Sequence, residues 1–94
     1  MDYTLRLLSW QGVVEKSIYT VEYEVLLELL KELRKQSGLS QLDLAEKLGQ
    51  TQSFVSKVER GDRRLDVIQL RTICHVLGQT LPKFVQQLEK RLSD

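Results

Sequence analysis

The sequence has very little cysteine and histidine. It contains one residue of each, Cys74 and His75, among 94 residues. A single cysteine excludes a disulfide within the chain and is typical of a reducing compartment. One cysteine and one histidine are also too few for a structural zinc site within one chain. We therefore expect a cytoplasmic protein without metal or cofactor, in which Cys74 is a small core residue and His75 a surface or half-buried residue.

Long apolar runs and catalytic motifs are also absent. The densest apolar run, Val25 to Leu30, contains Glu28 and is far shorter than the roughly 20 residues of a membrane-spanning helix. The first residues, with Asp2 and one early arginine, lack the basic start of a secretory signal peptide. There is no glycine-rich phosphate loop, no HExxH and no Gly-x-Ser-x-Gly sequence. We expect neither a membrane protein nor an enzyme.

The composition that is present is typical of one globular domain. Apolar residues make up 41% of the chain and charged residues 29%, which argues against intrinsic disorder. The length is too small for two independent cores. The net charge is only +1, but residues 1–30 carry three excess acidic charges and residues 31–64 carry three excess basic charges. This basic excess is a weak indication of a polyanionic partner.

From Thr20 onward the pattern predicts five helices, because apolar residues recur at helical spacing in five segments. A residue suited to an N-cap precedes each of the last four segments. These residues are Ser40, Thr51, Asp66 and Thr80. Each of the first four segments is followed by a glycine, which suits the positive φ of a helix end. These glycines are Gly38, Gly49, Gly61 and Gly78. Asp43 also has the spacing of a capping box with Ser40.

The last two predicted helices should close the core. The apolar side of the fourth consists of Val67, Leu70, Ile73, Cys74 and Leu77. The apolar side of the fifth consists of Leu81, Phe84, Val85, Leu88 and Leu92. The fifth helix either completes the core or forms a dimer seam, and Leu88 and Leu92 are its stronger interface candidates.

Residues 1–20 have a different pattern. Two runs rich in β-branched, aromatic and apolar residues flank Gln11 and Gly12, which indicates a β-hairpin. The adjacent Leu7 and Leu8 interrupt the alternation. Since two strands alone are barely stable, the hairpin should dock on the helices or on a second subunit. We therefore expect an N-terminal β-hairpin or arm over residues 1–20 and a helical domain over residues 21–94.

The second and third predicted helices are the most informative pair. Ala45 faces the next helix, where a larger side chain would push the two helices apart. Gly49 supplies the positive φ of a short turn, and Val55 and Val58 hold the third helix against the first two. Two helices joined by about three residues, with a glycine in the turn, are typical of a helix-turn-helix.

The third helix has two unlike faces on a helical wheel. Phe54, Val55 and Val58 form a core side. The other side is polar and consists of Gln52, Ser53, Ser56, Lys57 and Arg60. Phe54 lies at the edge of the core side, so it either packs inside or meets a thymine methyl group. An ordinary solvated helix face is the plain interpretation of the polar side.

The segment GLSQLDLAEKLGQTQSFVSKVERGDRRLDVIQLRTICHVLG, residues 38–78, resembles the lambda repressor/Cro-like helix-turn-helix family, also called the XRE family. The resemblance extends from about residue 23 to residue 88 and excludes the first twenty residues. It implies a mainly α, five-helix DNA-binding domain, with a second helix at about 41–48 and a recognition helix at about 52–60. It further implies a transcriptional regulator, in particular a dimeric repressor, whose recognition helix lies in the major groove of a near-palindromic operator.

The resemblance also implies roles for single residues. The implied base contacts are Gln52, Ser53, Ser56 and Lys57. The implied phosphate contacts are Gln41, Arg60, Arg63 and Arg64. Gln41 also matches a glutamine that buttresses the recognition helix, and Arg34 and Glu59 match a pair that forms a buried salt bridge in relatives. For Arg63 and Arg64 the alternative is pairing with Asp62 and Asp66.

Two other functions fit the same helices. An antitoxin would bind DNA in the same way and would also hold a toxin, through the N-terminal hairpin. A protein-interaction module would retain the fold without operator binding. The small net charge favours the module slightly, and the intact polar side of the third helix argues against it.

Overall fold

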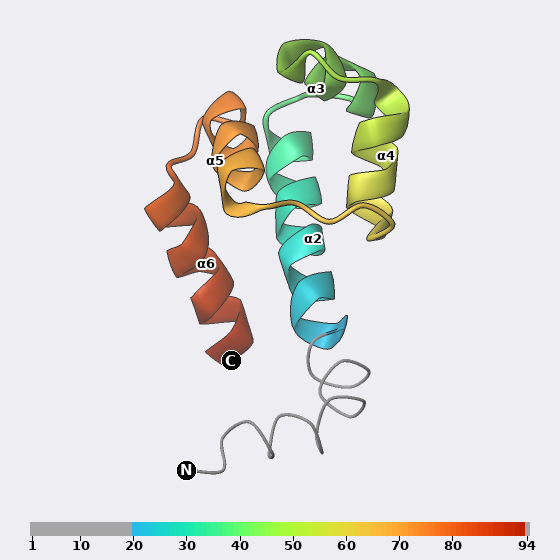
Figure 1. Ribbon diagram of the computed structural model, residues 1–94. Coiled ribbons are helices and arrows are strands. Elements are labelled where there is room, and N and C mark those ends of the chain that lie inside the picture. Colours follow the sequence, from blue (N-terminus) through green and yellow to red (C-terminus); the bar gives the residue numbers. More distant parts are fainter. Residues whose placement is uncertain (1–19, 94) are drawn as a thin grey trace.

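The computed structural model of this protein describes residues 20–93, with side chains from Val21 onward. This part of the chain consists of five helices, labelled as in Figure 1. They are α2 (Thr20–Gln36), α3 (Gln41–Leu48), α4 (Gln52–Arg60), α5 (Val67–Val76) and α6 (Leu81–Ser93). The predicted mainly α, five-helix architecture is confirmed. The hairpin expected over residues 1–20 lies outside the described residues, except that Thr20 already belongs to α2.

Helix α2 lies at the centre of the arrangement (Figure 1). Helix α4 packs on one side of α2 and α6 on the other, while α3 contacts both α4 and α5, and α5 contacts α6. Every helix contributes to one apolar core. Its buried residues are Leu29, Leu30, Leu33, Leu44, Ala45, Val55, Ile73, Cys74, Leu77 and Phe84. None of the helices in residues 20–93 is both long enough and apolar enough to cross a membrane.

Local hydrogen bonds set the ends of α3 and α4 where the sequence predicts them. The Ser40 hydroxyl accepts from the Asp43 backbone N–H at 3.0 Å, and the Asp43 carboxylate accepts from the Ser40 N–H at 3.0 Å. The Thr51 hydroxyl accepts from the Phe54 N–H at 3.1 Å. Between these caps, Gly49 has a φ of 67° and turns the chain. The link from α3 to α4 is therefore three residues long, as in a helix-turn-helix.

Two valines that were expected on apolar faces are exposed. Val67 is 60% exposed, because it is the first residue of α5 and the core contacts of this helix begin one turn later, at Leu70. Val85 is 42% exposed. It lies about 100° around α6 from the fully buried Phe84, so it falls at the edge of the face that packs on the core.

Cys74 lies in the middle of the core and is fully buried. Burial raises the pKa of its thiol to about 11. The thiol therefore stays protonated at neutral pH and acts as a small apolar group, as predicted. The neighbouring His75 is exposed.

Candidate nucleic-acid interface

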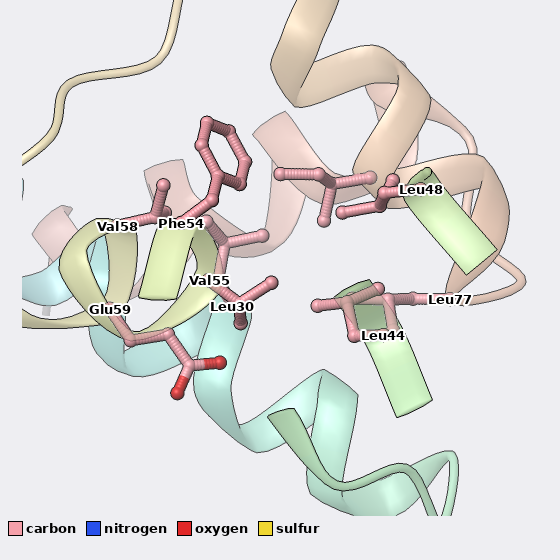
Figure 2. A pocket seen from close by; sticks show the side chains of 9 residues that line it. Leu30, Leu44, Leu48, Phe54, Val55, Val58, Glu59 and Leu77 are labelled. Carbon is pink, nitrogen blue, oxygen red and sulfur yellow. The ribbon is translucent and has the colours of Figure 1, made fainter. Parts of the chain in front are cut away.

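The inner face of α4 anchors this helix to the rest of the fold. Val55 and Val58 are buried, and Phe54 is half-buried against the core. Figure 2 shows these side chains around a small cavity that Leu30 of α2 and Leu44 of α3 also line. Because apolar contacts hold one face of α4 over its length, the opposite face is left to solvent.

The outer face of α4 presents the residues that the sequence predicts as base contacts. Gln52, Ser53 and Lys57 are exposed, and Ser56 is half-buried. The four residues have the spacing i, i+1, i+4 and i+5 along the helix, so their side chains share one side of it. The structure therefore brings these four residues together on one polar face of α4.

A buried carboxylate connects α4 to the two preceding helices. Arg34 of α2 donates from Nε to Glu59 Oε2 at 2.6 Å and from Nη2 to Oε1 at 3.1 Å. The two side chains are only 8% and 5% exposed. Gln41, the first residue of α3, donates from its side-chain amide to Glu59 Oε1 at 3.0 Å. One carboxylate thus receives hydrogen bonds from both α2 and α3.

The same arginine also holds the turn before α3. Arg34 donates from Nη1 to the Leu39 carbonyl at 2.7 Å. The resemblance implied the pair of Arg34 and Glu59 and a supporting role for Gln41, but it did not imply the contact with Leu39. A buried ion pair is stable only when its remaining donors and acceptors are satisfied. The bonds of Arg34 to Leu39 and of Gln41 to Glu59 therefore stabilise this pair. They fix the start of α3 relative to α4.

Two arginines after α4 lie over aromatic rings. The Arg63 guanidinium is 5.1 Å from the centroid of the Phe54 ring, and the Arg64 guanidinium is 4.5 Å from the centroid of the Tyr23 ring. The segment between α4 and α5 crosses α2 (Figure 1), which brings Arg64 to Tyr23. Phe54 therefore packs on the core and also supports a cation, and such stacking uses the face of a guanidinium rather than its in-plane N–H groups.

The two aspartates offered as alternative partners of these arginines have other contacts. Asp62 accepts from Arg60 Nε at 3.1 Å. Asp66 accepts from the Gln69 backbone N–H at 2.7 Å and so caps α5. Arg60 also donates from Nη1 to the Ser56 hydroxyl at 2.8 Å. This last bond is not among those expected from the sequence, although the four-residue spacing of the pair is the one at which helical side chains meet.

Comparison with known proteins agrees with this geometry. A family model described as helix-turn-helix matches residues 30–84, more than half of the chain. The chain belongs to the XRE helix-turn-helix family. It is therefore a DNA-binding protein of the kind that regulates transcription.

Two solved structures are similar to this helix-turn-helix protein. An XRE-family like protein from Pseudomonas syringae pv. tomato str. DC3000 is 41% identical, with a TM-score of 0.76, over 83% of this chain and 95% of that one. The clp gene regulator ClgR from Corynebacterium glutamicum is 24% identical, with a TM-score of 0.67, over 77% of each chain. The second likeness concerns the fold alone. No curated protein sequence matches the chain.

Proposed function

We propose that this protein is a dimeric transcriptional repressor that reads a near-palindromic operator with α4 in the major groove. The observation that carries the proposal is the polar, exposed outer face of α4. This face is held at a set angle by the buried contacts of Glu59 with Arg34 and Gln41. A helix that is rigidly presented in this way can insert into the groove without reordering the fold.

The proposed base contacts lie on the outer face of α4. The Gln52 side-chain amide can donate an N–H to N7 of adenine and accept a hydrogen bond from the N6 amino group with its carbonyl oxygen. The Lys57 ammonium offers only donors, which match O6 and N7 of guanine. Ser53, which is exposed, and Ser56, which is half-buried, lie between these two residues on the same polar side. Together the four side chains supply the sequence preference.

The proposed phosphate contacts surround this face. Arg63 and Arg64 follow α4 and are exposed. Gln41 begins α3, where the helix dipole and the first backbone N–H groups favour an anion. Contacts with phosphate add affinity and salt dependence without reading sequence.

Repression follows from occupancy of the operator. Two copies related by a two-fold axis would place their α4 helices in successive major grooves, with half-sites about 10 bp apart from centre to centre. A protein bound there blocks access to the same stretch of DNA.

Selection of binding sites from randomised duplex DNA tests the proposal. Enrichment of a near-palindrome with half-sites about one helical turn apart supports it. Salt-sensitive binding without an enriched sequence would contradict operator recognition. If the protein binds no DNA, that result contradicts the repressor and favours a protein-interaction module.

A further inference from the structure

Arg60 is held at two points on the outer face of α4. Its Nε donates to Asp62 Oδ2 at 3.1 Å, and its Nη1 donates to the Ser56 hydroxyl at 2.8 Å. The side chains of Arg60 and Asp62 are both more than half exposed. These two bonds orient the guanidinium, and more than half of the Arg60 side chain is exposed to solvent.

The contact with Ser56 also decides where the guanidinium lies along the helix. Arg60 is the last residue of α4, and Ser56 is one turn nearer the N-terminus. Helical side chains lean toward the N-terminus, and this bond holds the Arg60 head group level with Ser56. The guanidinium therefore lies against the polar side of α4 between Ser56 and Asp62, next to the face proposed to enter the groove.

We propose that Arg60 reads a guanine and that Asp62 is its positioning residue, an inference that rests on the proposed function of α4. A guanidinium has five N–H donors. The bonds to Asp62 and Ser56 use one on Nε and one on Nη1. The remaining donors, on Nη1 and Nη2, include the pair that matches the two acceptors O6 and N7 of guanine.

The carboxylate of Asp62 favours a base over a phosphate as the partner of Arg60. A phosphate that approached this guanidinium would also approach Asp62, and the two anions would repel each other. Guanine is neutral, so it keeps the hydrogen bonds without that repulsion. The pairing with Asp62 also holds the rotamer before DNA arrives, which reduces the entropy lost on binding.

This assignment changes the roles of two residues from those the resemblance implies. Arg60 becomes a base contact instead of a phosphate contact. Ser56 supports Arg60, because its hydroxyl already accepts the hydrogen bond from Nη1.

Site selection with wild type and Arg60→Ala tests the proposal. Wild type should select a guanine at one position of each half-site, and Arg60→Ala should lose the preference at that position alone. Its affinity for the selected site should fall by roughly ten- to a hundredfold. Uniform weakening with every preference retained would make Arg60 a phosphate contact, and no change would show that it does not touch DNA. Either result overturns the inference and leaves the proposed function standing, whereas a wild type that selects no sequence overturns both.

The positioning role of Asp62 has its own test, with Asp62→Asn and Asp62→Glu as the pair of variants. The measured quantity is the ratio of affinities for the selected guanine site and for the same site with that guanine replaced. Asp62→Asn should reduce this ratio several-fold and steepen the salt dependence, because Arg60 is then released to bind phosphate. Asp62→Glu should retain more of the ratio. An unchanged ratio in Asp62→Asn, with both variants folded by circular dichroism, contradicts the role.

Discussion

At the scale of single residues, the Glu59 carboxylate links the surface proposed to meet DNA with side chains buried behind it. Arg34→Ala would leave this carboxylate buried without its cation, which costs about 3–5 kcal/mol of unfolding free energy. Urea denaturation followed by circular dichroism measures the loss. Arg91→Ala is the control, since its ion pair with Glu32 is exposed and should contribute far less. Equal losses in the two variants would contradict the importance of burial.

Lys57 and Arg63 separate base reading from phosphate binding. Lys57→Ala should relax the sequence preference at one base pair, because its ammonium faces the groove in the proposed complex. Arg63→Ala should weaken binding to all sequences alike and flatten the slope of log affinity against log salt by about 1. Fluorescence anisotropy with selected and scrambled duplexes at several salt concentrations measures both effects. If both variants bind like wild type, this face is not the DNA surface.

At the scale of elements, the capping box of α3 makes stability depend on pH. The pKa of the Asp43 carboxyl lies below its ordinary value of 3.8, mainly because the Ser40 backbone N–H donates to it. Because the pKa is lower in the folded state, the ionised carboxylate stabilises the protein at pH values above its pKa in the unfolded state. This contribution is lost as the pH falls through the pKa in the folded state. Asp43→Asn should therefore lower the Tm at pH 7, and its difference from wild type should shrink as the pH falls through the folded-state pKa of Asp43.

Thermal unfolding from pH 2 to pH 7 provides the measurement. Glu46→Gln is the matched control, because it removes an equal charge from the exposed surface of α3, away from its N-terminus. This variant should not lower the Tm at pH 7, since an acidic side chain near a helix C-terminus does not favour the dipole. An Asp43→Asn variant as stable as wild type at pH 7 would show that the capping charge contributes nothing.

At the scale of the whole molecule, the proposed repressor needs two copies on one duplex. Two half-sites about 10 bp apart lie on the same face of DNA, and about five inserted base pairs would turn one of them to the opposite face. The insertion should lower affinity at least tenfold, and light scattering should show two chains bound per uninterrupted site. A single chain per site, or indifference to the insertion, would contradict the dimer.

The interface of that dimer stays a prediction. Leu88 packs partly against the core of its own chain, and Leu92 is half-buried at the end of α6. The expected hairpin, the other interface candidate, lies outside the described residues.

The accuracy of the sequence predictions depended on how far apart the interacting residues are. The ends of α3 and α4 were predicted from caps within three residues of each other, such as Ser40 and Asp43. The buried side of α4 followed from the 3.6-residue period alone. The exposure of Val67 and Val85 was missed, because a helical wheel shows which side is apolar but not how much of it the neighbouring helices cover.

By itself, the sequence determined the five helices, the short turn between α3 and α4 and the polar side of α4, because caps, glycines and periodicity act through neighbouring residues. The likeness to a known family added the pair of Arg34 and Glu59. Only the tertiary structure decided that Arg34 also holds Leu39 and that Arg63 lies over Phe54. It also decided that Arg60 is tied to Asp62 and Ser56. The contacts of Arg60 join residues close in the chain but depend on which rotamers the side chains adopt. The contact of Arg63 with Phe54 depends on how the segment after α4 runs over the fold, and the sequence does not specify that path.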